Sequence, residues 1–195
     1  DYYTEETVPL FDAYDVIICN TKRHYSAFEH LNNAHYIPWG TQTDVFKATK
    51  SSLVNDKYVT FFHSCGWDIN RKGTDLLLKA YAKTNNESKL VIHTQNPISR
   101  ADLVPIIDEL SKKGKLEIVE KTIHAPGLFY MGDIYVYPTR LEGIGLTIAE
   151  AISSGLGIIV PDNAPMNEFC NENHGCLINI SRFTARADGY YWPKC

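Results

Sequence analysis

The residues whose chemistry stands out are two glutamates, Glu142 and Glu150, on either side of a Gly-x-Gly turn. They lie eight positions apart in the run Y-P-T-R-L-E-G-I-G-L-T-I-A-E. The turn precedes a predicted helix, so the backbone N–H groups at the helix start lack acceptors within the helix and favour an anion. These groups belong to Gly143, Ile144, Gly145 and Leu146. A phosphate at these amides, with hydroxylated groups beside the two carboxylates, is the outline of a nucleotide-sugar.

A second loop, Gly66-Trp-Asp-Ile-Asn-Arg-Lys-Gly73, carries two adjacent cations, Arg71 and Lys72, just before another predicted helix. Alone, the loop is typical of solvated surface, because short basic clusters are common there. Both loops, however, follow predicted strands and precede predicted helices, and such loops meet at the ligand-binding edge of a parallel sheet. We therefore expect Lys72, helped by Arg71, to meet the charge of a diphosphate bound at residues 143–146.

Other phosphate-binding and metal-binding patterns are absent from the sequence. The second loop is not a P-loop, which needs Gly-Lys-Ser/Thr in that order, because here Lys72 precedes Gly73. The Gly-x-Gly turn is not a dinucleotide fingerprint, because Ile148 stands where the third glycine would be. No Asp-x-Asp pair occurs to hold a divalent cation on a diphosphate. We therefore expect neither a metal nor another cofactor, with cations and backbone N–H groups binding the diphosphate.

Each feature, taken singly, also has an ordinary structural explanation. Glu142 could be a surface carboxylate near a helix start, and Glu150 an acid on a helix face. His63, at the end of a predicted strand, is expected to be a core or hydrogen-bonded histidine rather than a ligand contact. No basic residues alternate with the aromatic side chains, so we expect core and domain-contact roles rather than nucleic-acid stacking. The aromatics in question are Tyr3, Tyr130, Tyr135, Tyr137 and the three at 190–192.

Composition sets limits on the class of protein. A chain of 195 residues can hold one α/β domain with a full core and a fragment of a second. Its 44% hydrophobic and 22% charged residues are ordinary for a globular protein, and the net charge of −4 gives no overall attraction to nucleic acid. The five cysteines are odd in number and show no C-x-x-C spacing, which indicates reduced thiols and a cytoplasmic location.

From residue 57 onward, short β-rich runs alternate with helical stretches. This alternation predicts an α/β fold, with a parallel sheet covered by helices on both faces. Strands are predicted at 58–63, 89–94, 115–121, 133–137, 157–161 and 176–180, and helices at 74–84, 99–113, 145–154 and 164–171, with a short link at 124–131.

The first 50 residues have a different pattern. A predicted strand at 15–19 and a helix at 24–30 lead through Tyr36-Ile-Pro-Trp-Gly40 into a polar stretch at 41–56. We interpret residues 1–50 as the end of an acceptor-side domain with its linker, and residues 51–195 as a nucleotide-sugar donor-binding domain. The start at Asp1 without a methionine suggests that the chain is a piece of something longer.

The motifs together resemble a known family. The run P-T-R-L-E-G-I-G-L-T-I-A-E-A-I-S-S-G is similar to the E-x7-E region of retaining GT-B glycosyltransferases of family 4, within the glycosyl transferases group 1 set. Residues from Pro38 to Phe46 resemble the family's P-N-G-x-D-x-x-x-F linker, and further matches occur at Gly66, at Arg71-Lys72-Gly73 and at Glu168. The resemblance covers nearly the whole chain and implies the C-terminal, Rossmann-like half of a GT-B fold.

The resemblance also implies roles for individual residues. Lys72 would hold the donor diphosphate, Glu142 would contact hydroxyls of the transferred sugar, and Glu150 would contact the ribose. The amides from Gly143 to Leu146 would line the sugar and phosphates, with Gly66 and Arg71 completing the donor site. Three positions depart from the family pattern: Trp67 replaces an arginine that binds phosphate in many members, Trp39 replaces the linker asparagine, and Gly157 replaces a proline.

The function implied is hexosyl transfer from a UDP-, GDP- or ADP-sugar to a saccharide or other hydroxyl acceptor, with retention at the anomeric carbon, as in polysaccharide biosynthesis. Two alternatives stay open: a nucleotide-sugar-binding module without activity as a fragment, and a nucleotide-sugar 2-epimerase of the same architecture. Peripheral membrane association through the preceding domain is also open, and nucleic acid is not an expected partner. From their position at strand ends, Gln95 and Lys121 are expected to lie near the base.

Overall fold

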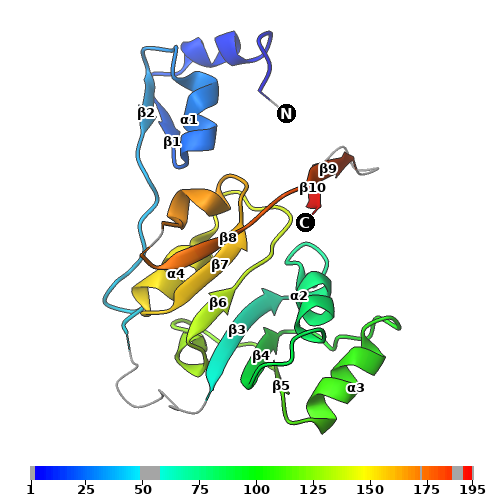
Figure 1. Cartoon of the computed structure of the whole chain (residues 1–195). Helices are drawn as coiled ribbons and strands as arrows, with labels where there is room; N and C mark the ends of the chain where they lie inside the picture. The colour runs from blue at the N-terminus through cyan, green and yellow to red at the C-terminus, as the bar shows by residue number, and fades with distance from the viewer. Residues whose placement is uncertain (1–2, 49–57, 172, 186–190, 195) are drawn as a thin grey trace.

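The computed structural model describes residues 3–48, 58–171, 173–185 and 191–194 (Figure 1). Its centre is a six-stranded sheet in the order β5-β4-β3-β6-β7-β8, in which every neighbouring pair is parallel. The order reverses direction between β3 and β6, and such a switch point is where open α/β sheets bind ligands. The strands are β3 (Val59–Gly66), β4 (Ser88–Thr94), β5 (Leu116–Glu120), β6 (Ile134–Val136), β7 (Gly157–Pro161) and β8 (Gly175–Ile178). The predicted α/β, Rossmann-like fold is confirmed.

Helices cover both faces of the sheet, each over its own hydrophobic core. Helices α2 (Thr74–Tyr81) and α3 (Val104–Lys112) pack on one face, and α4 (Leu146–Ser153) with the 3-10 turns η2 (Phe129–Met131) and η3 (Met166–Phe169) on the other. Successive strand residues alternate between the two cores, as the pleat requires. Leu90 and Ile92 belong to the core under α2 and α3, whereas Val91 belongs to the core under α4.

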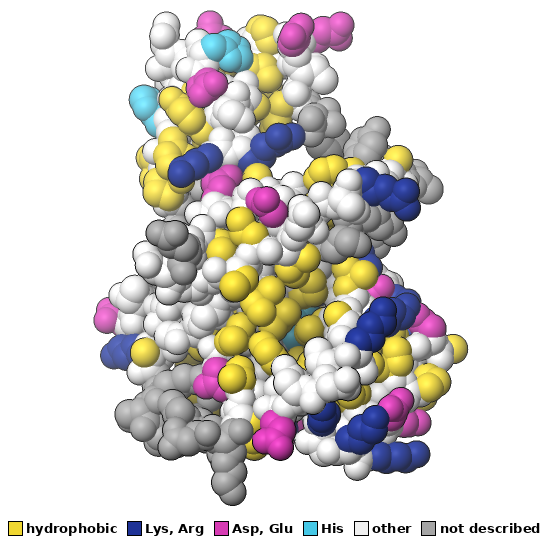
Figure 2. Space-filling model, in the orientation of Figure 1, with side chains coloured by type: hydrophobic (Ala, Val, Ile, Leu, Met, Phe, Trp, Pro, Cys, Tyr) yellow, Lys and Arg dark blue, Asp and Glu magenta, His cyan; other side chains and the backbone are white. Residues whose placement is uncertain are grey.

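The surface follows from this layering. In Figure 2, hydrophobic side chains gather over the middle of the molecule, and charged side chains of both signs lie over the side of α2 and α3. Exposed ion pairs on and next to these helices include Lys79 with Asp102 and Lys113 with Glu109. Within the part of the chain that the structure describes, no helix is both long and apolar enough to cross a bilayer.

The N-terminal segment forms a small unit beside this sheet. It contains η1 (Val8–Ala13), β1 (Ile17–Cys19), α1 (Lys22–Phe28) and β2 (Ala34–Tyr36), with β1 and β2 parallel. The carboxylate of Glu168 accepts hydrogen bonds from the backbone N–H groups of Lys22 and Arg23, at 2.6 and 2.9 Å, at the first turn of α1. Phe46 packs into the core under α4. The predicted domain boundary at 50/51 falls within residues 49–57, outside the described residues.

Several predicted element bounds are wrong. Strand β3 continues to Gly66 instead of ending at His63, because residues up to Gly66 still pair with β4. Helix α3 begins at Val104, not at residue 99, since Pro105 fits the first helical turn, where its missing N–H costs no hydrogen bond. The predicted helix at 164–171 is only the 3-10 turn η3. Three strands were not predicted at all, namely β2 and the antiparallel pair β9 (Arg182–Ala185) and β10 (Tyr191–Lys194), and neither was the 3-10 turn η1.

Candidate functional site

The two predicted loops meet at the switch point of the sheet. The basic loop with Arg71 and Lys72, residues 67–73, follows β3, and the glycine-containing loop with Glu142, residues 137–145, follows β6. The backbone N–H of Arg140 donates to the carbonyl of Arg71 at 2.8 Å, which joins the loops through their main chains. Gly73 allows this approach, because a Cβ there would lie 1.9 Å from the Pro138 carbonyl oxygen, and its φ is +72°.

A buried ion pair holds the same two loops together. The guanidinium of Arg140 donates to both carboxylate oxygens of Asp75, at 2.7 and 2.9 Å, and also to the carbonyl of Asn70. Burial alone would raise the pKa of Asp75, but the hydrogen bonds and charge of Arg140 prevail and lower it. The pair therefore fixes the start of α2 against the loop that carries Glu142.

Glu142 lies at the centre of a polar cluster built from both loops. Its Oε1 accepts hydrogen bonds from four side chains, two cationic and two hydroxyl-bearing. The donors are Arg71 Nη1 at 2.9 Å, Lys72 Nζ at 2.7 Å, the Tyr137 hydroxyl at 2.8 Å and the Thr139 hydroxyl at 2.9 Å. Among the described residues, no group donates to the other oxygen, Oε2. The structure thus brings Lys72, Arg71 and Glu142 into direct contact.

Lys72 has two hydrogen-bond partners in this cluster. Besides Glu142, its ammonium donates to the hydroxyl of Tyr137 and lies 4.8 Å from the centre of that ring. Burial lowers the pKa of Lys72, and the Glu142 carboxylate opposes that shift. The side chain is 14% exposed, so its charge faces a partly desolvated edge of the sheet, where a phosphate would interact strongly.

The start of α4 offers the predicted backbone donors. Gly145, with φ of +85°, precedes the helix, which begins at Leu146. The N–H groups of residues 143–146 donate to no other group in the described part of the chain. Gly143 is exposed, and a Cβ there would meet nothing within 4 Å. These amides are therefore available to an anion beside the Glu142 cluster.

Glu150 lies on the same side of the sheet as Glu142. Burial raises the pKa of Tyr135, and the charges of both Glu142 and Glu150 raise it further, which places the two carboxylates around one buried phenol. Glu150 is half-buried, burial raises its pKa, and its carboxylate contacts no hydrogen-bond donor among the residues described. Removing a carboxylate from water without giving it a hydrogen-bond donor costs free energy of folding. Such carboxylates are common in binding sites, where a bound ligand supplies the missing donor.

The remaining predicted residues lie at the same carboxyl edge. Gly66 ends β3, and its carbonyl accepts from the backbone N–H of Gln95 at 2.7 Å. Trp67 directly after it is 71% exposed. The carbonyl of Lys121 lies 2.7 Å from Nε2 of His93. Gln95 and Lys121 therefore both lie at the carboxyl edge of the sheet, and their proximity to a nucleobase stays a prediction.

His63 is a core residue, as predicted. It is fully buried, its Nδ1 lies 2.8 Å from the carbonyl of Val136, and its Nε2 lies 2.8 Å from the Thr74 hydroxyl. Burial, with a smaller contribution from the charge of Lys72, lowers its pKa to about 4. Its role is to tie β3 to β6 and α2 beneath the site.

Sequence reasoning missed two members of the Glu142 cluster, Tyr137 and Thr139, and also Arg140 of the ion pair that joins the loops. Tyr137 was assigned to the core on the strength of its ring, and Thr139 and Arg140 were not singled out. A signal was present, because Tyr137 and Thr139 alternate with Pro138 in an extended segment and can present both hydroxyls to one side.

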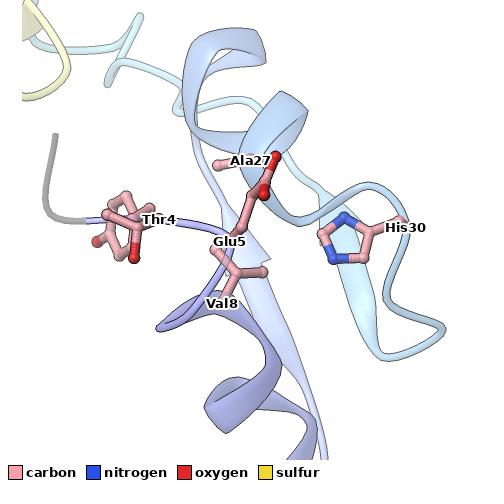
Figure 3. A pocket seen from close by; sticks show the side chains of 6 residues that line it. Thr4, Glu5, Val8, Ala27 and His30 are labelled. Carbon is pink, nitrogen blue, oxygen red and sulfur yellow. The ribbon is translucent and has the colours of Figure 1, made fainter.

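A separate cavity of about 350 Å³ lies in the N-terminal segment (Figure 3). It is lined by Tyr3, Thr4, Glu5, Val8, Ala27 and His30, none of which belongs to the two loops. In the described ranges, no three side chains among His, Cys, Asp and Glu gather as metal ligands. The prediction that no metal is needed stays a prediction.

Comparison with known proteins identifies the family. A model of the "Glycosyl transferases group 1" family matches residues 56–189, which is well over half of the chain. The chain belongs to this family. Its assignment to family 4 within that set stays a prediction.

Relatives of known name agree with the family. The GDP-mannose:cellobiosyl-diphosphopolyprenol alpha-mannosyltransferase of Xanthomonas oryzae pv. oryzae is 30% identical over 129 residues, which cover 63% of this chain and 34% of the relative. The structure of HepE from Anabaena in complex with UDP superposes with a TM-score of 0.71 at 17% identity, covering 91% of this chain and 55% of HepE. The structure of the pneumococcal O-GlcNAc transferase GtfA in complex with UDP and GlcNAc superposes with a TM-score of 0.68 at 20% identity. The match covers 93% of this chain and 37% of GtfA.

These structural likenesses establish the GT-B type of fold. The chain spans between about a third and somewhat over half of these relatives.

Proposed function

We propose that this chain is the donor-binding part of a retaining glycosyltransferase, which transfers a hexose from a nucleoside diphosphate sugar to a hydroxyl acceptor. One observation carries the proposal. Two cations and a carboxylate, Lys72, Arg71 and Glu142, meet within hydrogen-bonding distance at the switch point of the sheet. Beside them lie the amides of residues 143–146, which donate to no group among the residues described. A diphosphate needs the cations and amides, and a sugar needs the carboxylate.

The roles follow from the chemistry of each group. Lys72 turns its ammonium from Glu142 to the diphosphate, which the amides of residues 143–146 also contact. Glu142 accepts hydrogen bonds from hydroxyls of the sugar through Oε2. Glu150, which is desolvated and receives no hydrogen bond from the described residues, accepts from the ribose hydroxyls. The ammonium of Lys72 and the backbone N–H groups at the start of α4 replace the divalent cation that other transferases use, so no metal takes part.

The reaction breaks the bond between the anomeric carbon and the diphosphate oxygen. The acceptor oxygen forms its bond to the same carbon on the same face, and its proton passes to the departing diphosphate. The protein's part is to stabilise negative charge that grows on the leaving group, through Lys72 and the start of α4. The acceptor is a saccharide or another hydroxyl compound bound on the side of the preceding domain, and the reaction takes place in the cytoplasm.

The relatives support a nucleoside diphosphate as the ligand but differ in its base. HepE and GtfA were solved with UDP, whereas the mannosyltransferase is named for GDP-mannose. The diphosphate is the part these ligands share, and Lys72 and residues 143–146 are the groups that would bind it. The loops at Gln95 and Lys121 are left to distinguish the base.

The test is calorimetric titration of the 195-residue chain with UDP, GDP and ADP, in wild type and Lys72→Ala. We expect one nucleotide to bind, and Lys72→Ala to weaken it by about 10- to 100-fold, the value of a hydrogen bond to a charged group. Lys113→Ala is the matched control, because its ammonium is exposed and, among the described residues, pairs only with Glu109 on α3. If none of the three nucleotides binds wild type, or if both lysine variants bind equally well, the assignment is wrong.

A further inference from the structure

Tyr137 occupies an unusual position, with a ring in the core and a hydroxyl in the polar cluster. The residue is fully buried, and its ring stacks on that of Tyr135 with centroids 5.1 Å apart and planes at 21°. Its hydroxyl accepts from the Lys72 ammonium and donates to Oε1 of Glu142 at 2.8 Å. The phenol therefore relays a hydrogen bond from the cation to the carboxylate, and its packed ring allows it little movement.

Oε1 of Glu142 accepts more hydrogen bonds than it needs. Four donors approach this one oxygen, although a whole carboxylate has about four acceptor sites over its two oxygens. The oxygen can therefore lose one donor and remain well bound. Lys72 is the donor with another task, because a bound diphosphate would compete for its ammonium.

The hydroxyl of Tyr137 is suited to stay when Lys72 leaves. Burial, assisted by Tyr135 and by the charge of Glu142, raises the pKa of Tyr137, so its hydroxyl keeps its proton and remains a donor. Arg71, by contrast, is a third exposed, and its Nη1 also donates to the carbonyl of Leu141 at 3.0 Å, so its hydrogen bond to Glu142 is shared with another acceptor.

We propose that Tyr137 is a positioning residue that keeps Glu142 fixed, with Oε2 directed at the sugar, when Lys72 moves to the diphosphate. This inference rests on the proposed function and deepens it, since it assigns to one buried hydroxyl the preference for a sugar nucleotide over the bare nucleotide. The hydroxyl touches neither the sugar nor the phosphate, and it acts through Glu142.

The experiment compares two phenylalanine variants of adjacent, stacked tyrosines. Tyr137→Phe removes the hydroxyl that contacts Glu142, and Tyr135→Phe removes a buried hydroxyl that has no hydrogen-bond partner among the described residues. Calorimetry on the 195-residue chain measures affinity for UDP and UDP-glucose, and for GDP and GDP-mannose. The readout is the ratio of sugar-nucleotide affinity to nucleotide affinity, which general damage to the fold would leave unchanged.

For Tyr137→Phe we expect the sugar-nucleotide affinity to fall about tenfold, as for a lost hydrogen bond to a charged group, with nucleotide affinity within about twofold of wild type. Tyr135→Phe should leave both affinities unchanged. In the Glu142→Gln background, Tyr137→Phe should add little, because the hydroxyl acts through that carboxylate.

Three results would overturn the inference: equal losses for nucleotide and sugar nucleotide, no loss in either, or unfolding of Tyr137→Phe alone, which would assign the hydroxyl to stability. Failure of wild type to bind any of the four ligands would instead refute the proposed function itself.

Discussion

The pair Asp75–Arg140 gives the most quantitative prediction, with Asp75→Asn as the perturbation. The two side chains are 11% and 8% exposed, and both guanidinium contacts are short. Removing one partner of such a buried pair costs about 3–5 kcal/mol, because the remaining charge is left uncompensated. Asparagine keeps the shape of the side chain and one acceptor oxygen, so we expect a loss of unfolding free energy at the lower end of this range, about 3 kcal/mol. The second cation near Asp75, Arg100 at 3.4 Å, is a third exposed and adds little.

The assay is urea unfolding followed by circular dichroism. With a slope of about 2 kcal/mol per molar urea, a loss of about 3 kcal/mol lowers the midpoint by about 1.5 M. Glu109→Gln is the control, because Glu109 and Lys113 form an exposed pair, with side chains 65% and 57% accessible, one helical turn apart. That pair should contribute no more than about 0.5 kcal/mol.

The same variant has a pH signature. The folded-state pKa of Asp75 lies below its ordinary value of 3.8, so its contribution to stability is complete above that value and disappears as pH falls through the folded-state pKa. The difference between wild type and Asp75→Asn should therefore be constant from pH 7 to about 4 and shrink at lower pH. A midpoint shift no larger than that of Glu109→Gln, or a difference that persists unchanged at low pH, would contradict the ion-pair argument.

Two further variants test the loop contact and the second carboxylate. Gly73→Ala should destabilise the chain by at least about 2 kcal/mol in the same urea assay, since its Cβ would overlap the Pro138 carbonyl at a positive φ; an unchanged midpoint would mean that the loops are not in contact. Glu150→Gln should raise the melting temperature at pH 7, because burial raises the pKa of Glu150 and its ionised form therefore opposes folding above its unfolded-state pKa. The same variant should weaken nucleotide binding, because the proposed contact of the Glu150 carboxylate with the ribose hydroxyls is lost. A lower melting temperature, or unchanged binding, would refute that role.

Much of the fold could be predicted because its signals are local. Residues 90–92 form a short apolar run, typical of a strand buried on both faces, and the glycines at 73 and 145 precede helices as expected. The convergence of the two loops also follows from sequence, since strands that alternate with helices place their carboxyl ends on one edge. Strand β2 escaped prediction because only Ala34 of its three residues is buried, so the segment has no apolar run.

The chemistry within the site could be predicted only in part. Glu142 and Lys72 were identified, but their direct contact joins residues 70 positions apart and depends on how closely two loops pack. Asp75 and Arg140 are separated by 65 positions and leave no pattern in either loop. Tyr137 was assigned to the core, and its ring is there, but no periodicity indicates where a phenol oxygen ends up.

The most direct measurement of the central claim is a crystal structure of this chain with the nucleoside diphosphate that titration selects. The account predicts the diphosphate at the switch point, within hydrogen-bonding distance of Lys72 Nζ and of backbone N–H groups among residues 143–146, with the Lys72–Glu142 contact opened. A diphosphate bound elsewhere, such as in the cavity lined by Tyr3 and His30, or at the switch point without contact to Lys72, would contradict it.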